Sequence, residues 1–87
     1  MNWSVYMILC SDDSLYTGIT TDMERRLAQH ASQRGAKYFR GREPGPVVYL
    51  EAGHNRSSAS KREAEIKKLP PHLKRNLIAS ELNSLRP

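Results

Sequence analysis

Two β-prone runs around a short polar turn open this chain and constrain its fold more than any other feature. Residues 3–10 (WSVYMILC) and 15–20 (LYTGIT) are rich in aromatic, β-branched and other apolar side chains, which favour strands. Between them stands Ser11-Asp12-Asp13-Ser14, a composition typical of turns. The two runs are therefore expected to pair as an antiparallel hairpin.

The register of this hairpin decides which side chains share a face, because a slip of one residue moves a side chain to the opposite face. With a four-residue loop, Tyr6 and Tyr16 point to opposite faces. With a three-residue loop, Ser11 to Asp13, Tyr6 pairs with Gly18 and the two phenols are diagonal neighbours on one face. The shorter loop needs a left-handed residue at its last position, a conformation that Asp tolerates better than most residues. We therefore predict the three-residue loop, with Asp13 at positive φ.

A helix is expected directly after the hairpin. Thr21 as N-cap, with Glu24 three residues later, fits a capping box, and the helix should end at about Ala31. Met23, Leu27 and Ala31 form its apolar stripe.

One further strand and two further helices follow. Residues 47–51 (VVYLE) predict the third strand, and Ser57 or Ser58 is expected to cap a helix over about 59–69. Pro70-Pro71 should end that helix and start a last one over about 71–84. Its expected apolar positions are Leu73, Leu77, Ile78, Leu82 and Leu85. The predicted fold class is α+β, a small three-stranded antiparallel sheet flanked by helices in the order β-β-α-β-α-α.

The composition places the chain among soluble proteins. Its 87 residues should form one domain, 1–87, with the core motifs within about 3–70. Hydrophobic content is 38%, the longest apolar run is far too short to span a bilayer, and no leader pattern precedes it. A single cysteine, Cys10, excludes an internal disulfide. We therefore expect a cytoplasmic protein.

The charge favours a polyanionic partner. Lys and Arg number 14 against 9 Asp and Glu, a net charge of +5, which suits nucleic acid but also serves solubility. Residues 32–46 are expected to form a long basic loop that grips a sugar-phosphate backbone, with an aromatic side chain stacking on a base; a merely solvated loop is the alternative. The candidate nucleic-acid-binding residues in it are Arg34, Lys37, Tyr38, Arg40 and Arg42.

Four side chains of the hairpin and first helix suit chemistry on a phosphodiester. Tyr6 and Tyr16 bring phenols, and Arg26 and His30 stand one turn apart on the predicted helix. An arginine can clamp a phosphate in bidentate fashion, and an imidazole can move a proton. Each residue also has an ordinary structural interpretation, packing for the tyrosines and a solvated face for the helix.

Glu63 falls on the apolar stripe of its predicted helix, with Ala59, Ile66 and Leu69. A carboxylate there is costly unless something pairs with it. Mg²⁺ takes one or two protein carboxylates and completes its shell with water and phosphate oxygens, so a metal would solve this problem. A buried salt bridge to Arg26 or Lys67 is the alternative.

These residues resemble the motifs of the GIY-YIG nuclease superfamily, in its short single-domain bacterial form. The resemblance covers roughly residues 3–70. It rests on Ser4-Val5-Tyr6, on Tyr16-Thr17-Gly18 with Ile19-Thr20, on residues 25–30 (RRLAQH) and on residues 62–69 (REAEIKKL).

The resemblance implies roles for individual residues. Tyr6 would be the general base or a water-positioning phenol, with Tyr16 as its partner at the scissile phosphate. Arg26 would stabilise the transition state, and His30 would contact phosphate or assist proton transfer. Glu63 would hold one Mg²⁺ or Mn²⁺ ion.

The resemblance also implies a metal-dependent nuclease acting on DNA, with RNA not excluded and a protein partner as a possible source of specificity. A nucleic-acid-binding module with little catalysis, or a subunit activated by a partner, is the alternative. Some members carry a lysine after the second motif where Ile19 stands here, and Asn76 is only a loose match to a late asparagine.

Overall fold

A computed structural model describes residues 2–31 and 43–85 of the chain. Three strands, β1 (Trp3–Cys10), β2 (Leu15–Thr20) and β3 (Pro44–His54), form one antiparallel sheet in the order β2-β1-β3. The helices are α1 (Met23–Ala31), α2 (Arg56–Lys67) and α3 (Pro71–Ile78). The predicted α+β fold and element order are confirmed. Within these residues, no helix is long and apolar enough to cross a membrane.

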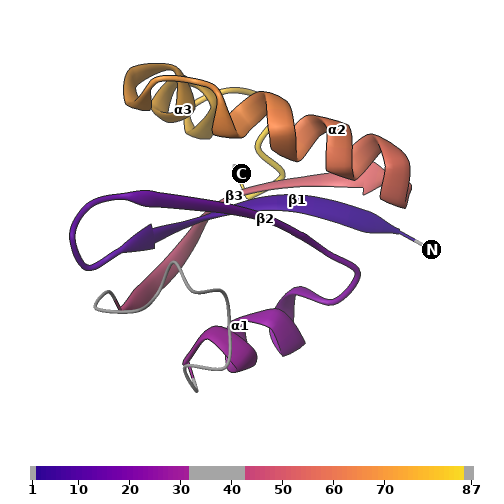
Figure 1. Cartoon of the computed structure of the whole chain (residues 1–87), viewed down its shortest axis with the longest axis horizontal. Helices are drawn as coiled ribbons and strands as arrows, with labels where there is room; N and C mark the ends of the chain where they lie inside the picture. The colour runs from indigo at the N-terminus through magenta and orange to yellow at the C-terminus, as the bar shows by residue number, and fades with distance from the viewer. Residues whose placement is uncertain (1, 32–42, 86–87) are drawn as a thin grey trace.

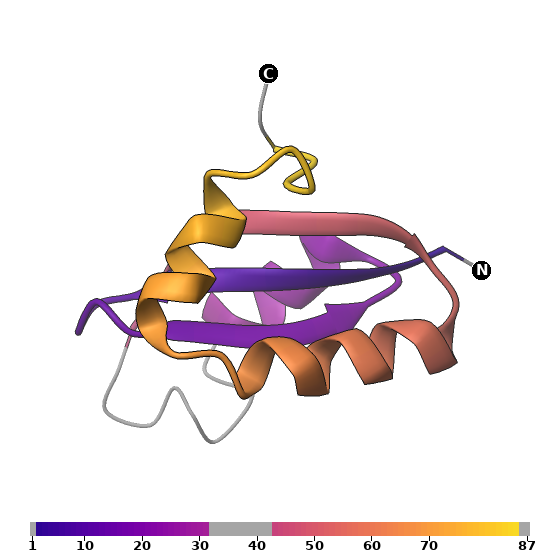
Figure 2. The same ribbon diagram turned by 90° about the horizontal axis from the view of Figure 1, so that it is seen from above.

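The sheet separates two helical layers. Helices α2 and α3 lie on one face of the sheet and α1 lies on the other (Figure 1). Seen from above, α2 runs along the β2 side of the sheet while α3 crosses it at one end (Figure 2). Val5 and Met7 of β1 pack toward α2, against Ala59 and Ile66. The intervening side chains of β1, beginning with Tyr6, therefore face α1.

The hairpin has the predicted register. Tyr6 pairs with Gly18 and Ile8 pairs with Tyr16, and Asp13 has a φ of 66°. Both tyrosines consequently lie on the face that α1 covers. Tyr6 and Ile8 are fully buried there, with Met23 and Leu27 of α1 packed against them, as the predicted stripe requires.

The caps of the first two helices differ from the prediction. Asp22, not Thr21, accepts the backbone N–H of Arg25 through its side chain, so α1 starts one residue later than expected. Asn55, not Ser57 or Ser58, caps α2. Ser58 instead stands at the third helical position and completes the capping box by accepting the Asn55 N–H.

The outer parts of the chain were predicted less well. Strand β3 is longer than residues 47–51, and its first three residues come from the expected basic loop. Helix α3 ends at Ile78 and not near residue 84, so Leu82 and Leu85 are 55% and 47% exposed instead of lying on an apolar helix face. Residues 79–85 form turns and irregular backbone after α3, and Asn83 among them is buried.

That asparagine, Asn83, ties the chain end to β3. Its side-chain amide donates to the carbonyls of Val48 and Ile78, and its oxygen accepts the N–H of Leu50. Asn83 is only 4% exposed, so these bonds replace water at a buried polar group. Because Asn83 satisfies backbone groups on the outer strand, it holds the segment after α3 against the sheet and not in a helix.

Candidate active site

The hydroxyl of Tyr6 is the centre of a cluster between β1 and α1. It lies 3.0 Å from Nε2 of His30, and the Nε–H of Arg26 donates to it over 3.2 Å. Arg26 and His30 reach the same phenol because they are one turn apart on the helix face adjacent to its apolar stripe. Tyr6 and His30 are fully buried, whereas Arg26 is half-buried.

Tyr16 completes the cluster from the neighbouring strand. Its ring centroid lies 6.2 Å from that of Tyr6 and 5.4 Å from that of His30, edge-on to the imidazole. Tyr16 is partly exposed, so its side chain connects the buried phenol to the surface. The hairpin register and α1 thus bring together four of the five residues that were predicted to be catalytic.

Gly18 makes room for this arrangement. A Cβ atom at this position would lie 2.5 Å from the Tyr6 hydroxyl and 3.1 Å from the Tyr16 ring. Real Cβ atoms do not approach other atoms as closely as 2.5 Å, so any side chain here would push the phenol away. The glycine is required by the cluster and not by the backbone of the strand.

The surroundings shift the proton affinities of the cluster. Burial raises the pKa of Tyr6 to about 12, despite the opposing hydrogen bond from Arg26, and the charge of Glu63 adds a smaller contribution. Burial, and then the Arg26 charge, lower the pKa of His30 below its usual range. The hydrogen bond to Tyr6 raises the pKa of Arg26. At neutral pH the cluster therefore holds a protonated phenol, a neutral imidazole and a guanidinium.

Glu63 lies on the flank of α2. Its side chain is 25% exposed, so the carboxylate is partly buried at the edge of the apolar stripe, where the helical period places it about 40° from Ala59 and about 60° from Ile66. Its carboxylate is 3.5 Å from Nζ of Lys67, which is 53% exposed. Of the two predicted salt bridges, the structure contains the one to Lys67. It is a surface i,i+4 pair and not a buried one.

Glu63 is a single candidate carboxylate for a metal ion. In the part of the chain that the structure describes, no group of three or more His, Cys, Asp or Glu side chains could hold a metal ion. A site built on one carboxylate suits Mg²⁺ or Mn²⁺, which take their remaining ligands from water and phosphate. It does not suit zinc, which needs three or four protein ligands.

The predicted nucleic-acid-binding residues cannot be compared with the structure. Arg34, Lys37, Tyr38, Arg40 and Arg42 all lie outside the described residues. The two cavities described below are lined by other residues.

A second polar cluster connects β3 with α2, and sequence reasoning missed it. Glu51 accepts hydrogen bonds from Tyr49 (2.5 Å) and Arg62 (3.1 Å), and Nε2 of His54 lies 2.6 Å from it. The alternation of Tyr49 and Glu51 on one strand face, with Arg62 on the facing helix, was the signal that could have found it.

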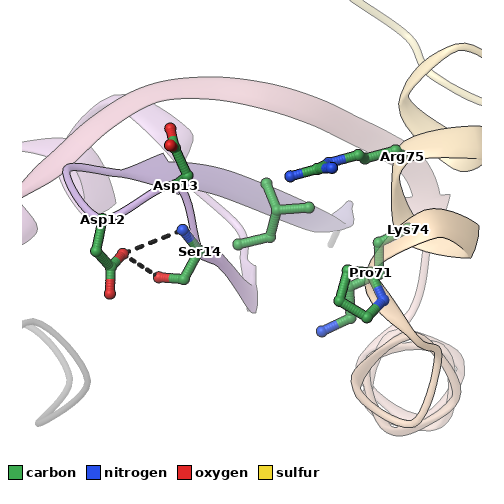
Figure 3. A pocket seen from close by; sticks show the side chains of 7 residues that line it. Asp12, Asp13, Ser14, Pro71, Lys74 and Arg75 are labelled. Carbon is green, nitrogen blue, oxygen red and sulfur yellow. Dashed lines mark hydrogen bonds between the residues drawn. The ribbon is translucent and has the colours of Figure 1, made fainter.

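A cavity of about 300 Å³ lies between the hairpin loop and the start of α3 (Figure 3). Asp12 and Asp13 stand on one side, and Lys74 and Arg75 on the other. Asp12 is bound to Ser14 within its own turn. The cavity contains none of the catalytic candidates, so it is separate from the cluster around Tyr6.

A family model described as "GIY-YIG catalytic domain" matches residues 2–76. The chain belongs to the GIY-YIG family. The match covers the strands and helices that carry Tyr6, Tyr16, Arg26, His30 and Glu63, in agreement with the resemblance of the motifs.

Other short GIY-YIG proteins are similar over most of the chain. It is 52% identical to UPF0213 protein DP2720 of Desulfotalea psychrophila, over 91% of this chain and 74% of the relative. The solution NMR structure of UPF0213 protein BH0048 from Bacillus halodurans has a TM-score of 0.60 at 42% identity, covering 97% of this chain and 89% of the other. That of protein EF2693 from E. faecalis has a TM-score of 0.63 at 36% identity, covering 100% and 94%.

Proposed function

We propose that this protein is a divalent-metal-dependent endonuclease that hydrolyses phosphodiester bonds in DNA. The observation that carries the proposal is the buried Tyr6 hydroxyl, held between the Arg26 guanidinium and the His30 imidazole in a GIY-YIG domain. A fixed guanidinium stabilises the negative charge that develops during phosphoryl transfer, and a phenol with an imidazole can move a proton.

The hydrogen-bond directions define a path for that proton. Arg26 can only donate, so the Tyr6 oxygen accepts from it and directs its own hydrogen toward Nε2 of His30. The lowered pKa of His30 keeps that nitrogen able to accept. When the attacking water transfers a proton to the Tyr6 oxygen, the phenol transfers its own proton to His30. Tyr6 thereby acts as a base without ever becoming a free phenolate, which its raised pKa disfavours.

Arg26 and Tyr16 bind the scissile phosphate. A guanidinium has five N–H donors, and the bonds to Tyr6, to Oε1 of Gln29 and to Tyr16 do not use all of them. The others donate to phosphate oxygens, where the charge builds in the transition state. Tyr16, partly exposed on the same face, donates its hydroxyl to the same phosphate.

Glu63 would hold the metal, Mg²⁺ or Mn²⁺. A bound ion there supplies Lewis-acid stabilisation of the phosphate and of the leaving oxygen. The Glu63 carboxylate is partly exposed and forms an ion pair with Lys67, which is 53% exposed, so little is lost when it binds a cation. The net charge of +5 attracts the polyanionic substrate, and we also propose a protein partner as one source of specificity.

A cleavage assay on labelled DNA and RNA structures tests this proposal. Wild-type protein is incubated with Mg²⁺, Mn²⁺ or EDTA, beside Arg26→Ala and Glu63→Gln. Arg75→Ala is the matched control for the loss of a positive charge, because Arg75 is an exposed residue of α3.

Metal-dependent cleavage by the wild type and the control, with a loss of at least about 100-fold in the two site variants, supports the proposal. Cleavage that survives both substitutions identifies a contaminant. Binding without cleavage under every condition identifies a binding module instead of a nuclease.

A further inference from the structure

A groove of about 230 Å³ adjoins the candidate active site and has no role in the proposed chemistry. It lies between the start of β1, the end of β2 and the first turns of α1. Arg26 lines it, so the groove is continuous with the cluster around Tyr6. A substrate held at Arg26 would therefore have its neighbouring chain unit in or near this groove.

One wall of the groove is apolar and carries an aromatic ring. Trp3 and Ile19 form this wall, and the guanidinium of Arg56 lies 5.9 Å from the Trp3 ring centroid. A cation over the indole face holds the ring in place and adds positive charge beside it. The ring is partly exposed, so part of its surface is available to a ligand.

The part of the lining that comes from α1 is polar and cationic. Arg25, Arg26 and Gln29 come from successive turns of α1. Asp22 also lines the groove, but its carboxylate accepts the N–H of Arg25 at the helix start, which offsets part of its negative charge. The lining of this groove thus combines an aromatic ring with two guanidinium groups, which match the two halves of a nucleotide, a planar base and a phosphate.

The size of the groove limits what it can hold. Pockets for whole drug-sized ligands measure about 300–1,000 Å³. A groove of about 230 Å³ is smaller, so it suits one planar group attached to a longer chain and not a separate small molecule.

We propose that this groove is a subsite for the nucleotide next to the scissile phosphate, with its base against Trp3 and its phosphate at Arg25. This inference rests on the proposed nuclease function. Trp3 and Arg25 are then specificity-determining residues and take no part in the bond breaking. Since a paired base cannot stack on a protein ring, the flanking nucleotide must be unpaired or turned out of its helix.

The fluorescence of Trp3 tests the subsite directly, because Trp3 is the sole tryptophan of the chain. Full-length protein is titrated in EDTA, which prevents cleavage, with three dye-labelled probes. These are a short oligothymidylate, an abasic phosphodiester chain of equal length and a duplex. Anisotropy of the label reports binding, and the indole emission reports contact with the base.

Saturable quenching of Trp3 by the oligothymidylate is expected, with the abasic chain binding roughly 5- to 150-fold more weakly and without quenching. Trp3→Leu should raise KM for cleavage by a similar factor with little change in kcat, while Trp3→Phe retains most of the affinity. Arg25→Gln should weaken binding of the oligothymidylate and of the abasic chain alike. If Trp3→Leu fails to fold, the wild-type titration and Arg25→Gln still decide.

The outcomes separate the subsite from the nuclease function. Binding and cleavage with unchanged Trp3 emission, or with equal affinity for the abasic chain, overturn the subsite alone. Quenching by the duplex to the same extent contradicts the requirement for an unpaired base. Absence of binding to every probe by anisotropy overturns both proposals.

Discussion

The Tyr6 hydroxyl lies 3.0 Å from Nε2 of His30, a residue 24 positions later in the chain, and both side chains are fully buried. The sheet and α1 thus hold a phenol and an imidazole in direct contact inside the fold. The Nε–H of Arg26 approaches the same oxygen from the adjacent turn of the helix. This contact is the basis of the proton path, and it makes the activity sensitive to the protonation of His30.

Cleavage should therefore depend on pH through His30. Burial lowers its pKa below the usual 6.5, and only the neutral ring accepts the Tyr6 proton. The single-turnover rate should be independent of His30 ionisation at neutral pH and fall tenfold per unit as pH drops below that lowered pKa. His30→Gln should abolish this limb of the profile and slow cleavage by about 100-fold or more. If the cleavage rate of His30→Gln still falls at low pH as in the wild type, the pH dependence comes from another group.

A methyl group at Gly18 should remove activity through Tyr6. In Gly18→Ala the new Cβ would lie 2.5 Å from the Tyr6 hydroxyl, so the phenol must move away from Arg26 and His30. We expect at least a 100-fold loss of cleavage and a loss of stability of about 1–3 kcal/mol from overpacking.

Gly53→Ala is the matched control for Gly18→Ala. Gly53 has a φ of +85° and open space around the position of a Cβ, so alanine there strains the backbone by about 1 kcal/mol without touching the cluster. Thermal unfolding and cleavage rates of both variants should be compared. Equal loss of activity in the two would show that stability, and not the position of Tyr6, governs the rate.

Much of this site was predictable because it depends on local patterns. A three-residue loop fixed which face Tyr6 and Tyr16 share, and the helical period placed Arg26 beside His30. The family motifs added Glu63. Asp13 could be assigned a positive φ from turn chemistry alone.

The parts that were predicted wrongly depend on contacts that are distant in sequence. Helix α3 was predicted to extend to about residue 84 because its leucines have helical spacing, yet Asn83 bonds to β3 and holds its own segment against the strand. No local signal shows which strand carbonyl an asparagine will reach.

Glu63→Gln should affect catalysis and not folding. The pair with Lys67 is at the surface, and such pairs contribute about 0.3–0.5 kcal/mol, so unfolding free energy in the absence of metal should change by no more than about 0.5 kcal/mol. Cleavage should fall by at least 100-fold at saturating DNA.

Glu65→Gln provides the control on the same helix. Glu65 is 66% exposed and forms a 3.7 Å ion pair with Arg62, so its loss has a similar electrostatic effect outside the site. Normal cleavage is expected at every Mg²⁺ concentration. Should Glu63→Gln cleave as well as Glu65→Gln, the metal is not held by Glu63.

The Glu51 cluster should make stability depend on acid. Burial raises the pKa of Glu51, but hydrogen bonds from Tyr49 and His54 and the charge of Arg62 together outweigh it and lower the pKa overall. A lowered folded-state pKa contributes stability that is present above the unfolded value of about 4.3 and is lost as pH falls through the folded value.

Denaturant unfolding across pH 3–7 measures this contribution. In Glu51→Gln the dependence on acid should be reduced, and stability at pH 7 should be lower by about 1–3 kcal/mol because Arg62 and Tyr49 lose their ionised acceptor. A variant as stable as the wild type at pH 7, with the same acid dependence, would contradict a stabilising role for the cluster.

Single-turnover cleavage by Tyr6→Phe tests the central claim most directly. Phenylalanine keeps the buried ring and removes only the oxygen that joins Arg26 to His30. With the fold verified by thermal unfolding and DNA binding retained, the cleavage rate in Mg²⁺ should fall by at least about 100-fold. A rate within about threefold of the wild type would show that the Tyr6 hydroxyl does not carry the reaction.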